Sequence, residues 1–366
     1  MNSPRRPESD ISGTHSELPV AGFECPLPLR DHPHIVMGHG SGGRMSADLI
    51  RHLFLPAFHA DSDCEPLLDS AVLPSPGRRL ALTSDSFVVR PLFFPGGSIG
   101  ELAVNGTVND LAMSGAIPLY LTASFILEEG FSLATLAEIA QRMGRAARIA
   151  GVSIVAGDTK VVEHGCADGC YITTSGIGSI PDGIEISPIR IQAGDVILVS
   201  GTIGDHGMAV MSVREGLEFE SQIVSDTAAL HELVSCMLNV CPGIRMLRDP
   251  TRGGLAASMH EIAAASACGI VLQESQIPVN PSVQAACELL GLDPLHVANE
   301  GKLVAFVPAH AADAVLKAMH AHPLGSNARV IGQSTAEHAG RVTVATAFGT
   351  NRILTLPLSE QLPRIC

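Results

Sequence analysis

The chain has 366 residues, of which 46% are apolar and 36 are glycine, and its formal net charge is −14. This composition is typical of a glycine-rich globular protein, long enough for two domains, and it excludes a disordered one. The negative charge argues against a nucleic-acid partner, and no run of about 18 apolar residues indicates a membrane span. The nine cysteines are irregularly spaced, which favours reduced thiols. Because the start of the chain also lacks the apolar stretch of a signal peptide, we expect a cytoplasmic protein with no membrane partner.

The first part of the chain is predicted to contain an arm and an α/β half. Residues 1–34 are rich in Pro, Ser, His and charge, and we expect a disordered arm there. The first half is expected over residues 35–182. Its predicted elements are a strand over 78–86, a helix from Leu133 that Ser132 caps and Gly151 ends, a strand over 152–159 and a strand over 170–180.

A second α/β half is predicted over residues 183–350, followed by a tail over 351–366. The expected elements are strands near 195–204, 302–308, 329–333 and 341–348 and helices over 255–269 and about 309–320. Helices and strands alternate in both halves, so the sequence predicts an α/β or α+β fold.

A glycine-rich segment, Gly38–Arg44, is a candidate phosphate loop. Gly40, Ser41, Gly42 and Gly43 lie at its centre, where the absence of Cβ atoms lets backbone N–H groups converge on an anion. The segment is neither a Walker loop nor a dinucleotide fingerprint. A flexible turn remains an equal alternative.

Three acidic residues are candidate magnesium ligands. Asp85, Asp110 and Asp158 each follow an apolar run and precede small or polar residues, so we expect them in loops. Mg²⁺ takes oxygen ligands from a few carboxylates together with nucleotide phosphates. The three acids and the glycine-rich segment therefore indicate a Mg–ATP site, although each acid taken singly is as easily a cap or turn residue.

Four further residues are candidates for binding or catalysis. Lys160 follows Asp158 by two positions, so both side chains point to one side of an extended strand. Arg252 and Gly253 precede a helix whose N-terminus could accept an anion, or they form an ordinary helix entry. Glu300, in a glycine turn before a strand, is a candidate base or ligand, with a surface carboxylate as the alternative.

Cysteines suggest two more sites. Cys366 is the last residue of the chain, behind Pro363, where a thiol has nothing after it to pack against. Cys166 and Cys170, with His164 nearby, have a spacing compatible with zinc, but no second pair of matching spacing follows.

Ten motifs occur in order along the chain: "HGSGGR", "TSDSFVVRPLFFPGG", "NGTVNDLAMSGAIP", "FILEEGF", "AGDTKVV", "VSGTIGDHG", "RDPTRGGL", "HEIAAA", "ANEGKL" and the terminal "PRIC". Together they resemble the HypE family of hydrogenase expression/formation proteins, from about residue 35 to 366. The ATP-site motifs are shared with a wider superfamily that includes aminoimidazole ribonucleotide synthetase, selenophosphate synthetase and thiamine monophosphate kinase. The terminal "PRIC" distinguishes HypE from these.

The resemblance implies a two-domain fold like that of aminoimidazole ribonucleotide synthetase, with the N-terminal sheet at a homodimer interface, ATP and Mg²⁺ between the halves and a mobile C-terminal tail. It implies dehydration of an S-carboxamide on Cys366 to a thiocyanate. The carboxamide comes from HypF, and the HypC–HypD complex accepts the cyanide for the iron of [NiFe]-hydrogenase. Lys160 and Glu300 would be catalytic, Asp85, Asp110 and Asp158 would bind metal, and Asn109 and Thr159 would join the residues above in binding ATP.

Two other functions are compatible with the same motifs. One is a small-molecule kinase of the superfamily, such as a selenophosphate synthetase, which would want a reactive residue near the N-terminus, where Cys25 is the candidate. The other is a non-catalytic assembly scaffold that uses nucleotide only as a switch. Asp69, followed by Ser70 where many superfamily members carry a second acid, is a weaker ligand candidate.

Overall fold

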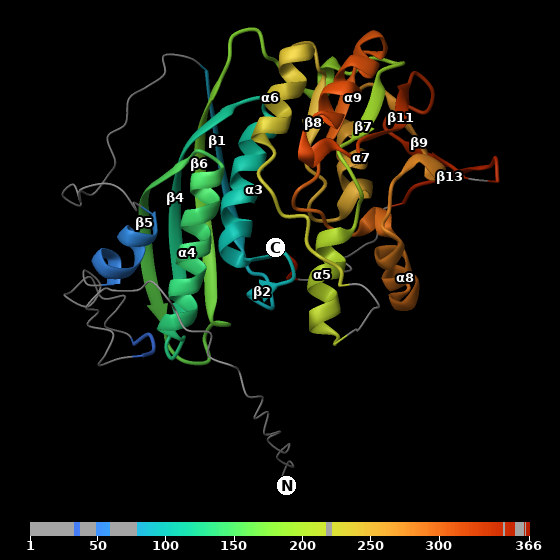
Figure 1. The fold of residues 1–366 in the computed structure, drawn as a ribbon. Helices are drawn as coiled ribbons and strands as arrows, with labels where there is room; N and C mark the ends of the chain where they lie inside the picture. The colour runs from blue at the N-terminus through green and yellow to red at the C-terminus, as the bar shows by residue number, and fades with distance from the viewer. Residues whose placement is uncertain are drawn as a thin grey trace.

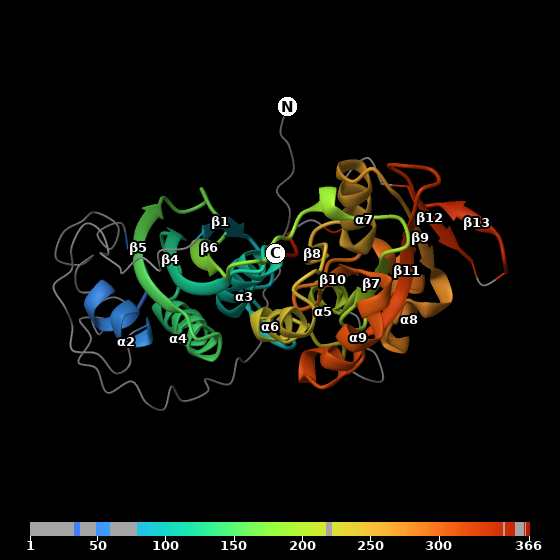
Figure 2. The same cartoon turned by 90° about the horizontal axis from the view of Figure 1, so that it is seen from above.

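The computed structural model describes residues 33–36, 49–58, 79–216, 222–346, 348–355, 362 and 364–366. The glycine-rich segment with Gly40, Ser41, Gly42 and Gly43 lies outside the described residues, as do Cys25, Asp69 and nearly all of the predicted arm. Two α/β halves lie side by side, and the C-terminus lies between them (Figures 1 and 2).

The first half is built on a four-stranded sheet with the order β1-β6-β4-β5. All neighbours pair antiparallel except β4 and β5, which are parallel. The helices α3 and α4 pack on one face of this sheet (Figure 2). The elements are the π-helix η3 Ile50–Phe54, α2 Leu55–Phe58, β1 Arg79–Phe87, β2 Phe93–Phe94, β3 Gly97–Ser98, α3 Ile99–Met113, β4 Ile117–Glu128, α4 Leu133–Ile149, β5 Ser153–Val162 and β6 Cys170–Ile180.

The helix α4 forms as predicted from the sequence. Ser132 accepts a hydrogen bond from the Thr135 N–H through its Oγ (3.4 Å), and Gly151 follows the helix with φ +64°. Its apolar residues recur every three or four positions, which places them on one stripe against the sheet. The buried members predicted from that spacing are Leu133, Leu136, Ala140, Met143 and Ala147.

The opposite face of the four-stranded sheet is open among the described residues (Figure 2). Leu82 on β1 is 78% exposed and Leu80 is 48% exposed. Ile117 and Ile126 on β4 are 54% and 42% exposed. Apolar side chains on two strands of one uncovered face form a patch that a soluble monomer would rarely leave in water.

The second half contains a seven-stranded sheet with the order β13-β12-β9-β11-β7-β10-β8. Only β12 and β9 are parallel. The strands are β7 Val196–Val199, β8 Met246–Arg248, β9 Gly269–Gln273, β10 Val304–Val307, β11 Arg329–Thr335, β12 Val342–Ala345 and β13 Asn351–Ile353. The helices are α5 Asp205–Arg214, α6 His231–Val240, α7 Gly254–Ala265, α8 Pro281–Leu290 and α9 Ala312–His320, with short 3₁₀ turns at Pro188–Arg190, Glu274–Gln276, Pro294–His296, Ala309–Ala311 and Pro323–Gly325.

Helices cover both faces at the centre of this sheet. In β10, Phe306 packs with Leu255 and Met259 of α7, whereas Ala305 packs in the cluster of α6 and α9. Every residue of β10 is therefore buried, and the strand reads as a continuous apolar run rather than an alternating one. Among the described residues, none of the helices is at once long and apolar enough to cross a bilayer.

Candidate active site

A cleft of about 510 Å³ receives residues from both halves and from the end of the chain. The first half contributes through β1 and α3, and the second half through β8, the start of α7 and the segment before β10. The residues on its wall that can bind charge or move protons are Asp85, Asp110, Arg248, Asp249, Arg252, Glu300 and Cys366.

Three carboxylates share this wall. Asp85 lies on β1, Asp110 lies in the last turn of α3 and accepts a hydrogen bond from Thr83 Oγ1 (2.7 Å), and Asp249 follows β8. Burial raises the pKa of all three, and the charge of Asp110 adds to the effect on Asp249, whose pKa rises to about 7. Arg252 opposes the pKa shifts of Asp85 and Asp110. Such a set of oxygen donors beside an arginine is suited to a cation and phosphate groups.

Asp249 was missed by sequence reasoning. It lies within "RDPTRGGL", the motif in which only Arg252, Gly253 and the helix after them were predicted to bind an anion. The available signal was the position of this acid directly after an apolar strand and before a Pro-Thr turn, the same context that singled out the other acids.

The expectation that the acids lie in loops is wrong. Asp85 lies within β1, Asp110 within α3 and Asp158 within β5, which continues to Val162 instead of ending near 159. Their neighbours are small or polar for another reason. On β1 the serines on both sides of Asp85 alternate onto the uncovered sheet face, and on β5 a Cβ at Gly157, beside Asp158, would meet the Ala123 carbonyl oxygen at 2.1 Å. On α3 the small Gly106 lies against Asp85, whose Oδ2 would be 3.7 Å from a Cβ at that glycine.

Asp158 and Lys160 lie away from the cleft of their own chain. They form an ion pair (Nζ to Oδ2, 3.3 Å) with side chains 62% and 66% exposed. The strand register leads from Asp158 straight across the sheet to Ser86, the residue after Asp85. Paired residues point to one face and successive residues to opposite faces, so Asp158 points to the open face and Asp85 to the face under α3. Three strand spacings, roughly 14 Å, also separate them.

Two expected nucleotide ligands have other positions. Asn109 is 1% exposed, and its side-chain amide contacts three backbone groups, the Ala228 and Glu300 carbonyls and the Leu230 N–H. This amide joins α3 to the second half, and Asn109 is not among the residues that line the cleft. Thr159 lies beside Asp158 on β5, away from the cleft.

Glu300 is held firmly in the cleft wall. It is 3% exposed, its N–H donates to Asp226 Oδ1 (3.1 Å), and its carbonyl accepts from Asn109 (3.1 Å). Gly301 allows this packing, because a Cβ there would meet the Asp226 carbonyl oxygen at 1.7 Å. Among the described residues, Glu300 Oε1 has no hydrogen-bond partner. Burial, and then the charges of Asp226, Asp249 and Asp85, raise the pKa of Glu300 well above its usual value.

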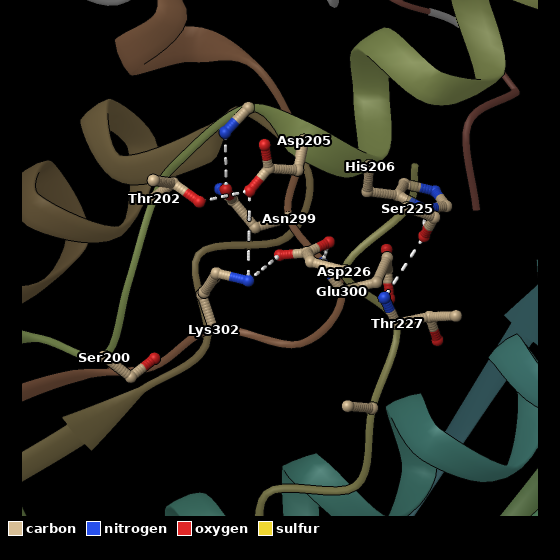
Figure 3. Close-up of polar contacts among 12 residues, drawn as sticks. Ser200, Thr202, Asp205, His206, Ser225, Asp226, Thr227, Asn299, Glu300 and Lys302 are labelled. Carbon is tan, nitrogen blue, oxygen red and sulfur yellow. Dashed lines mark hydrogen bonds and ion pairs between the residues drawn. The ribbon is translucent and has the colours of Figure 1, made fainter. Parts of the chain in front are cut away.

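A buried charge network lies beside the segment that carries Glu300 (Figure 3). Lys302 lies between Asp226 (3.1 Å) and Asp205 (4.0 Å), and Asp205 is also bonded by Thr202 and Asn280. Because removing one member would leave a buried charge without its partner, this network fixes the segment that carries Glu300.

Arg252 and Gly253 precede α7 as predicted. Gly253 is the N-cap with φ +74°, and Gly254 has φ +62°. A Cβ at Gly254 would meet the Leu295 and Val297 carbonyl oxygens at 2.6 Å, so the helix entry packs too closely for any other residue. The entry brings Arg252 to the cleft.

The end of the chain is seated in the cleft. A terminal carboxylate oxygen of Cys366 accepts a hydrogen bond from the Val88 N–H (3.2 Å), and the Arg364 carbonyl accepts one from the Arg90 N–H (3.3 Å). Ile365 between them is 1% exposed and Cys366 is partly buried on the cleft wall. The expectation of a mobile tail is untested, because the structure gives one position of residues 364–366, inside.

The zinc interpretation of Cys166 and Cys170 receives no support. Cys166 is exposed, whereas Cys170 is buried, and burial raises the pKa of the Cys170 thiol to about 12. In the described part of the chain, no three His, Cys, Asp or Glu side chains are close enough to hold a metal ion by themselves. A magnesium ion at Asp85, Asp110 and Asp249 would therefore need the phosphates of a nucleotide as further ligands.

The comparisons with known proteins agree with this architecture. The AIR synthase related protein N-terminal domain matches residues 68–180, and the corresponding C-terminal domain matches residues 192–345. The chain is 55% identical to the carbamoyl dehydratase HypE of Cupriavidus necator over 345 residues, which cover 94% of this chain and 98% of the relative.

Solved structures are similar over most of the chain. A crystal structure of the hydrogenase maturation protein HypE in complex with ATP has a TM-score of 0.86 and 46% identity, covering 90% of this chain and 99% of that one. A HypE–HypF complex has a TM-score of 0.74 and 51% identity, covering 76% of this chain and 90% of that one. On this identity and coverage, the chain belongs to the HypE family of hydrogenase maturation proteins, within the AIR synthase related proteins.

Proposed function

We propose that the chain is an ATP-dependent carbamoyl dehydratase whose substrate is an S-carboxamide on its own Cys366. The observation that carries this proposal is the position of Cys366 on the same cleft wall as three carboxylates, Arg252 and Glu300. The relatives named carbamoyl dehydratase and the ATP-bound relative support it.

The reaction requires activation of a poor leaving group. The carboxamide S–C(=O)–NH₂ cannot expel oxide, so its oxygen first attacks the γ-phosphoryl group of ATP, which releases ADP and one N–H proton. Loss of phosphate and of the second N–H proton then gives S–C≡N. The carboxamide oxygen leaves in phosphate, so the net change is carboxamide and ATP to thiocyanate, ADP and phosphate.

The charged residues of the cleft have matching roles. Asp85, Asp110 and Asp249 would hold Mg²⁺ together with the nucleotide phosphates, and the ion would supply charge neutralisation at those phosphates. Arg252 at the entry of α7 would bind a phosphate oxygen directly. Asp85 on β1 and Asp110 on α3 are held by regular secondary structure, whereas Asp249 and Arg252 lie in the short turn between β8 and α7.

Glu300 is the proposed base. Its pKa is raised by burial, so its carboxylate form is a stronger base than an exposed glutamate and is better matched to a weakly acidic N–H. The side-chain oxygen without a described hydrogen-bond partner is available to accept that proton.

The wider route uses partners. HypF would supply the carbamoyl group from carbamoyl phosphate, and the relative crystallised with HypF supports this. The HypC–HypD complex would accept the cyanide, which becomes an iron ligand in [NiFe]-hydrogenase.

A homodimer would bring Lys160 into use. A second copy packed on the open sheet face would cover Leu80, Leu82, Ile117 and Ile126. Lys160 lies on that same face and away from its own cleft, so we propose that it acts at the cleft of the partner copy, where it would stabilise charge on the carboxamide oxygen or the phosphoryl group.

The two alternative functions explain less. A small-molecule kinase has no use for a terminal thiol, and a nucleotide-switched scaffold has no use for a buried glutamate of raised pKa beside that thiol. Neither alternative accounts for the end of the chain lying in the cleft.

Mass spectrometry of the C-terminal peptide tests the dehydratase. After incubation with HypF, carbamoyl phosphate and Mg–ATP, we expect a carbamoyl adduct on Cys366 that loses one water only when ATP is present.

Glu300→Gln should accept the adduct and bind ATP but dehydrate about 10²- to 10⁴-fold more slowly, because the base is lost. One residue appended after Cys366 should preserve ATP binding and abolish cyanide delivery. An adduct that dehydrates without ATP, or at an unchanged rate in Glu300→Gln, would contradict the proposal.

Mixing two inactive variants tests Lys160. Lys160→Ala carrying the carboxamide should be inactive alone, and Cys366→Ala has no thiol to react. If Lys160 acts across the dimer, mixing them after subunit exchange should restore dehydration, because mixed dimers contain one complete cleft. Native mass spectrometry verifies the exchange. Verified mixed dimers without activity would show that Lys160 does not act in the partner's cleft.

Asp249→Asn tests the carboxylate set through pH. The pKa of Asp249 is about 7 in the folded protein against the ordinary 3.8, so this group costs the folded state stability as pH rises from about 4 to about 7. Without magnesium, the variant should melt above the wild type at pH 8, with a smaller gap at pH 5, and Mg–ATP should stabilise it less. Asp182→Asn, at an exposed site, is the control. An equal gap at both pH values would contradict the assigned pKa shift.

A further inference from the structure

Two of the side-chain contacts that hold the end of the chain, beyond its backbone bonds, differ sharply in their surroundings. One contact is fully buried and involves the carbonyl of Ile365. The other is partly exposed and involves the side chain of Arg364. The two differ in chemistry, so they can be tested separately.

His206 makes the buried contact. Its side chain is 0% exposed, and its Nε2–H donates to the Ile365 carbonyl oxygen (2.9 Å). Its Nδ1 accepts from the Ser225 hydroxyl (2.8 Å), whose oxygen also receives the Thr227 N–H (3.1 Å). Because the Ile365 carbonyl can only accept, the neutral imidazole carries its proton on Nε2, and Ser225 holds the ring through Nδ1. The Phe94 ring packs edge-on against the imidazole, with 5.3 Å between the two ring centroids, and fixes the orientation of the imidazole.

Asp168 makes the exposed contact. This residue lies in the "CADGC" loop between β5 and β6, which neither the metal interpretation nor the dehydratase chemistry explains. It forms ion pairs with Arg364 and with Arg90 (3.2 Å). Arg364 has φ +59°, a backbone conformation that non-glycine residues rarely adopt, and Arg214 Nη2 donates to its carbonyl (2.7 Å).

The buried contact also connects the tail to the proposed base. Ser225, which orients His206, is followed by Asp226, which accepts the Glu300 N–H and pairs with Lys302. Figure 3 shows these residues converging on one segment. A single stretch of backbone thus sets the position of both the tail and Glu300.

We propose that His206 and Asp168 are positioning residues that set the register of residues 364–366, so that Cys366 enters the cleft at the level of Glu300. The contribution to dehydration rests on the proposed function, whereas the seating of the tail does not. Release of Cys366 breaks, among its other contacts, one buried neutral hydrogen bond to His206 and one partly exposed ion pair to Asp168. The first contact is insensitive to salt and the second is weakened by it.

Alkylation of Cys366 by iodoacetamide measures seating without any enzymatic turnover. Cleavage after Glu360 releases the terminal peptide for mass spectrometry. The alkylation rate of wild-type Cys366 is first measured with and without Mg–ATP, and the variants are then compared in the condition that gives the lower wild-type rate. His206→Phe should raise the alkylation rate roughly 5- to 30-fold, the effect of losing one buried hydrogen bond. His206→Gln, which keeps a donor near the Nε2 position, should stay within about threefold of wild type.

Matched controls separate seating from folding. His320 on α9 donates from Nε2 to the Ala328 carbonyl (2.8 Å), so His320→Phe also removes a bond from an imidazole to a backbone carbonyl, at an exposed position away from the tail, and should leave Cys366 protected. If His206→Phe fails to fold, Ser225→Ala loosens the same imidazole and should raise alkylation about two- to fivefold. Unchanged Cys366 reactivity in folded His206→Phe or, failing that, in folded Ser225→Ala would overturn the role of His206.

Salt distinguishes the exposed contact. Asp168→Asn should raise alkylation about two- to fivefold at low ionic strength, and the difference from wild type should vanish near 1 M NaCl because ion pairs are screened there. Glu163→Gln removes a charge from an exposed position in the same loop and should have no effect. An absent or salt-independent effect of Asp168→Asn would overturn the role of Asp168.

Dehydration of the preloaded chain then links seating to chemistry. His206→Phe should lower the single-turnover rate by a factor similar to its gain in alkylation, with ATP affinity unchanged, and His206→Gln should restore most of it. If the wild type fails to dehydrate while the alkylation pattern holds, the proposed function fails and the seating stands. If His206→Phe shows raised alkylation of Cys366 but dehydrates at the wild-type rate, the proposed positioning role of His206 in catalysis is overturned.

Discussion

The backbone hydrogen bonds between residues 364–366 and residues 88–90 are the contact on which the arrangement depends. They join the end of the chain to residues 88–90, which directly follow β1, the strand that carries Asp85. The same few residues reach α5 of the second half through His206. A segment too short to fold by itself thus obtains its conformation from both halves, and its last residue lies where both halves supply charged groups.

The cleft keeps acids in an environment that opposes their ionisation. Asp249 and Glu300 are buried, near one another and near other carboxylates, and their pKa values rise as a result. Replacement by neutral residues would be less costly for folding, so their presence points to a ligand or a proton that compensates for the charge. Under the proposed function, a cation with phosphates beside Asp249 and a transferable proton at Glu300 would be two such compensations, and the Arg252 charge is a third.

Local patterns predicted much of the fold but not how its faces are arranged. The spacing of apolar residues in α4 and the paired glycines before α7 predicted those helices, because each signal is complete within a few residues. The faces of Asp85 and Asp158 depend on strand register, and the tether role of Asn109 depends on a partner more than a hundred residues away. Neither property is encoded in the local sequence. For that reason Asp158 was predicted to share a site with Asp85 and Asp110, whereas the third acid in the cleft is Asp249.

The most direct test of the account follows one oxygen atom. Carbamoyl phosphate labelled with ¹⁸O at its carbonyl, HypF and the chain would load a labelled carboxamide onto Cys366, and Mg–ATP would start a single turnover. If the seated carboxamide is phosphorylated in the cleft, the label will appear in inorganic phosphate in step with formation of the thiocyanate. Label released into water, with none in phosphate, would contradict the account.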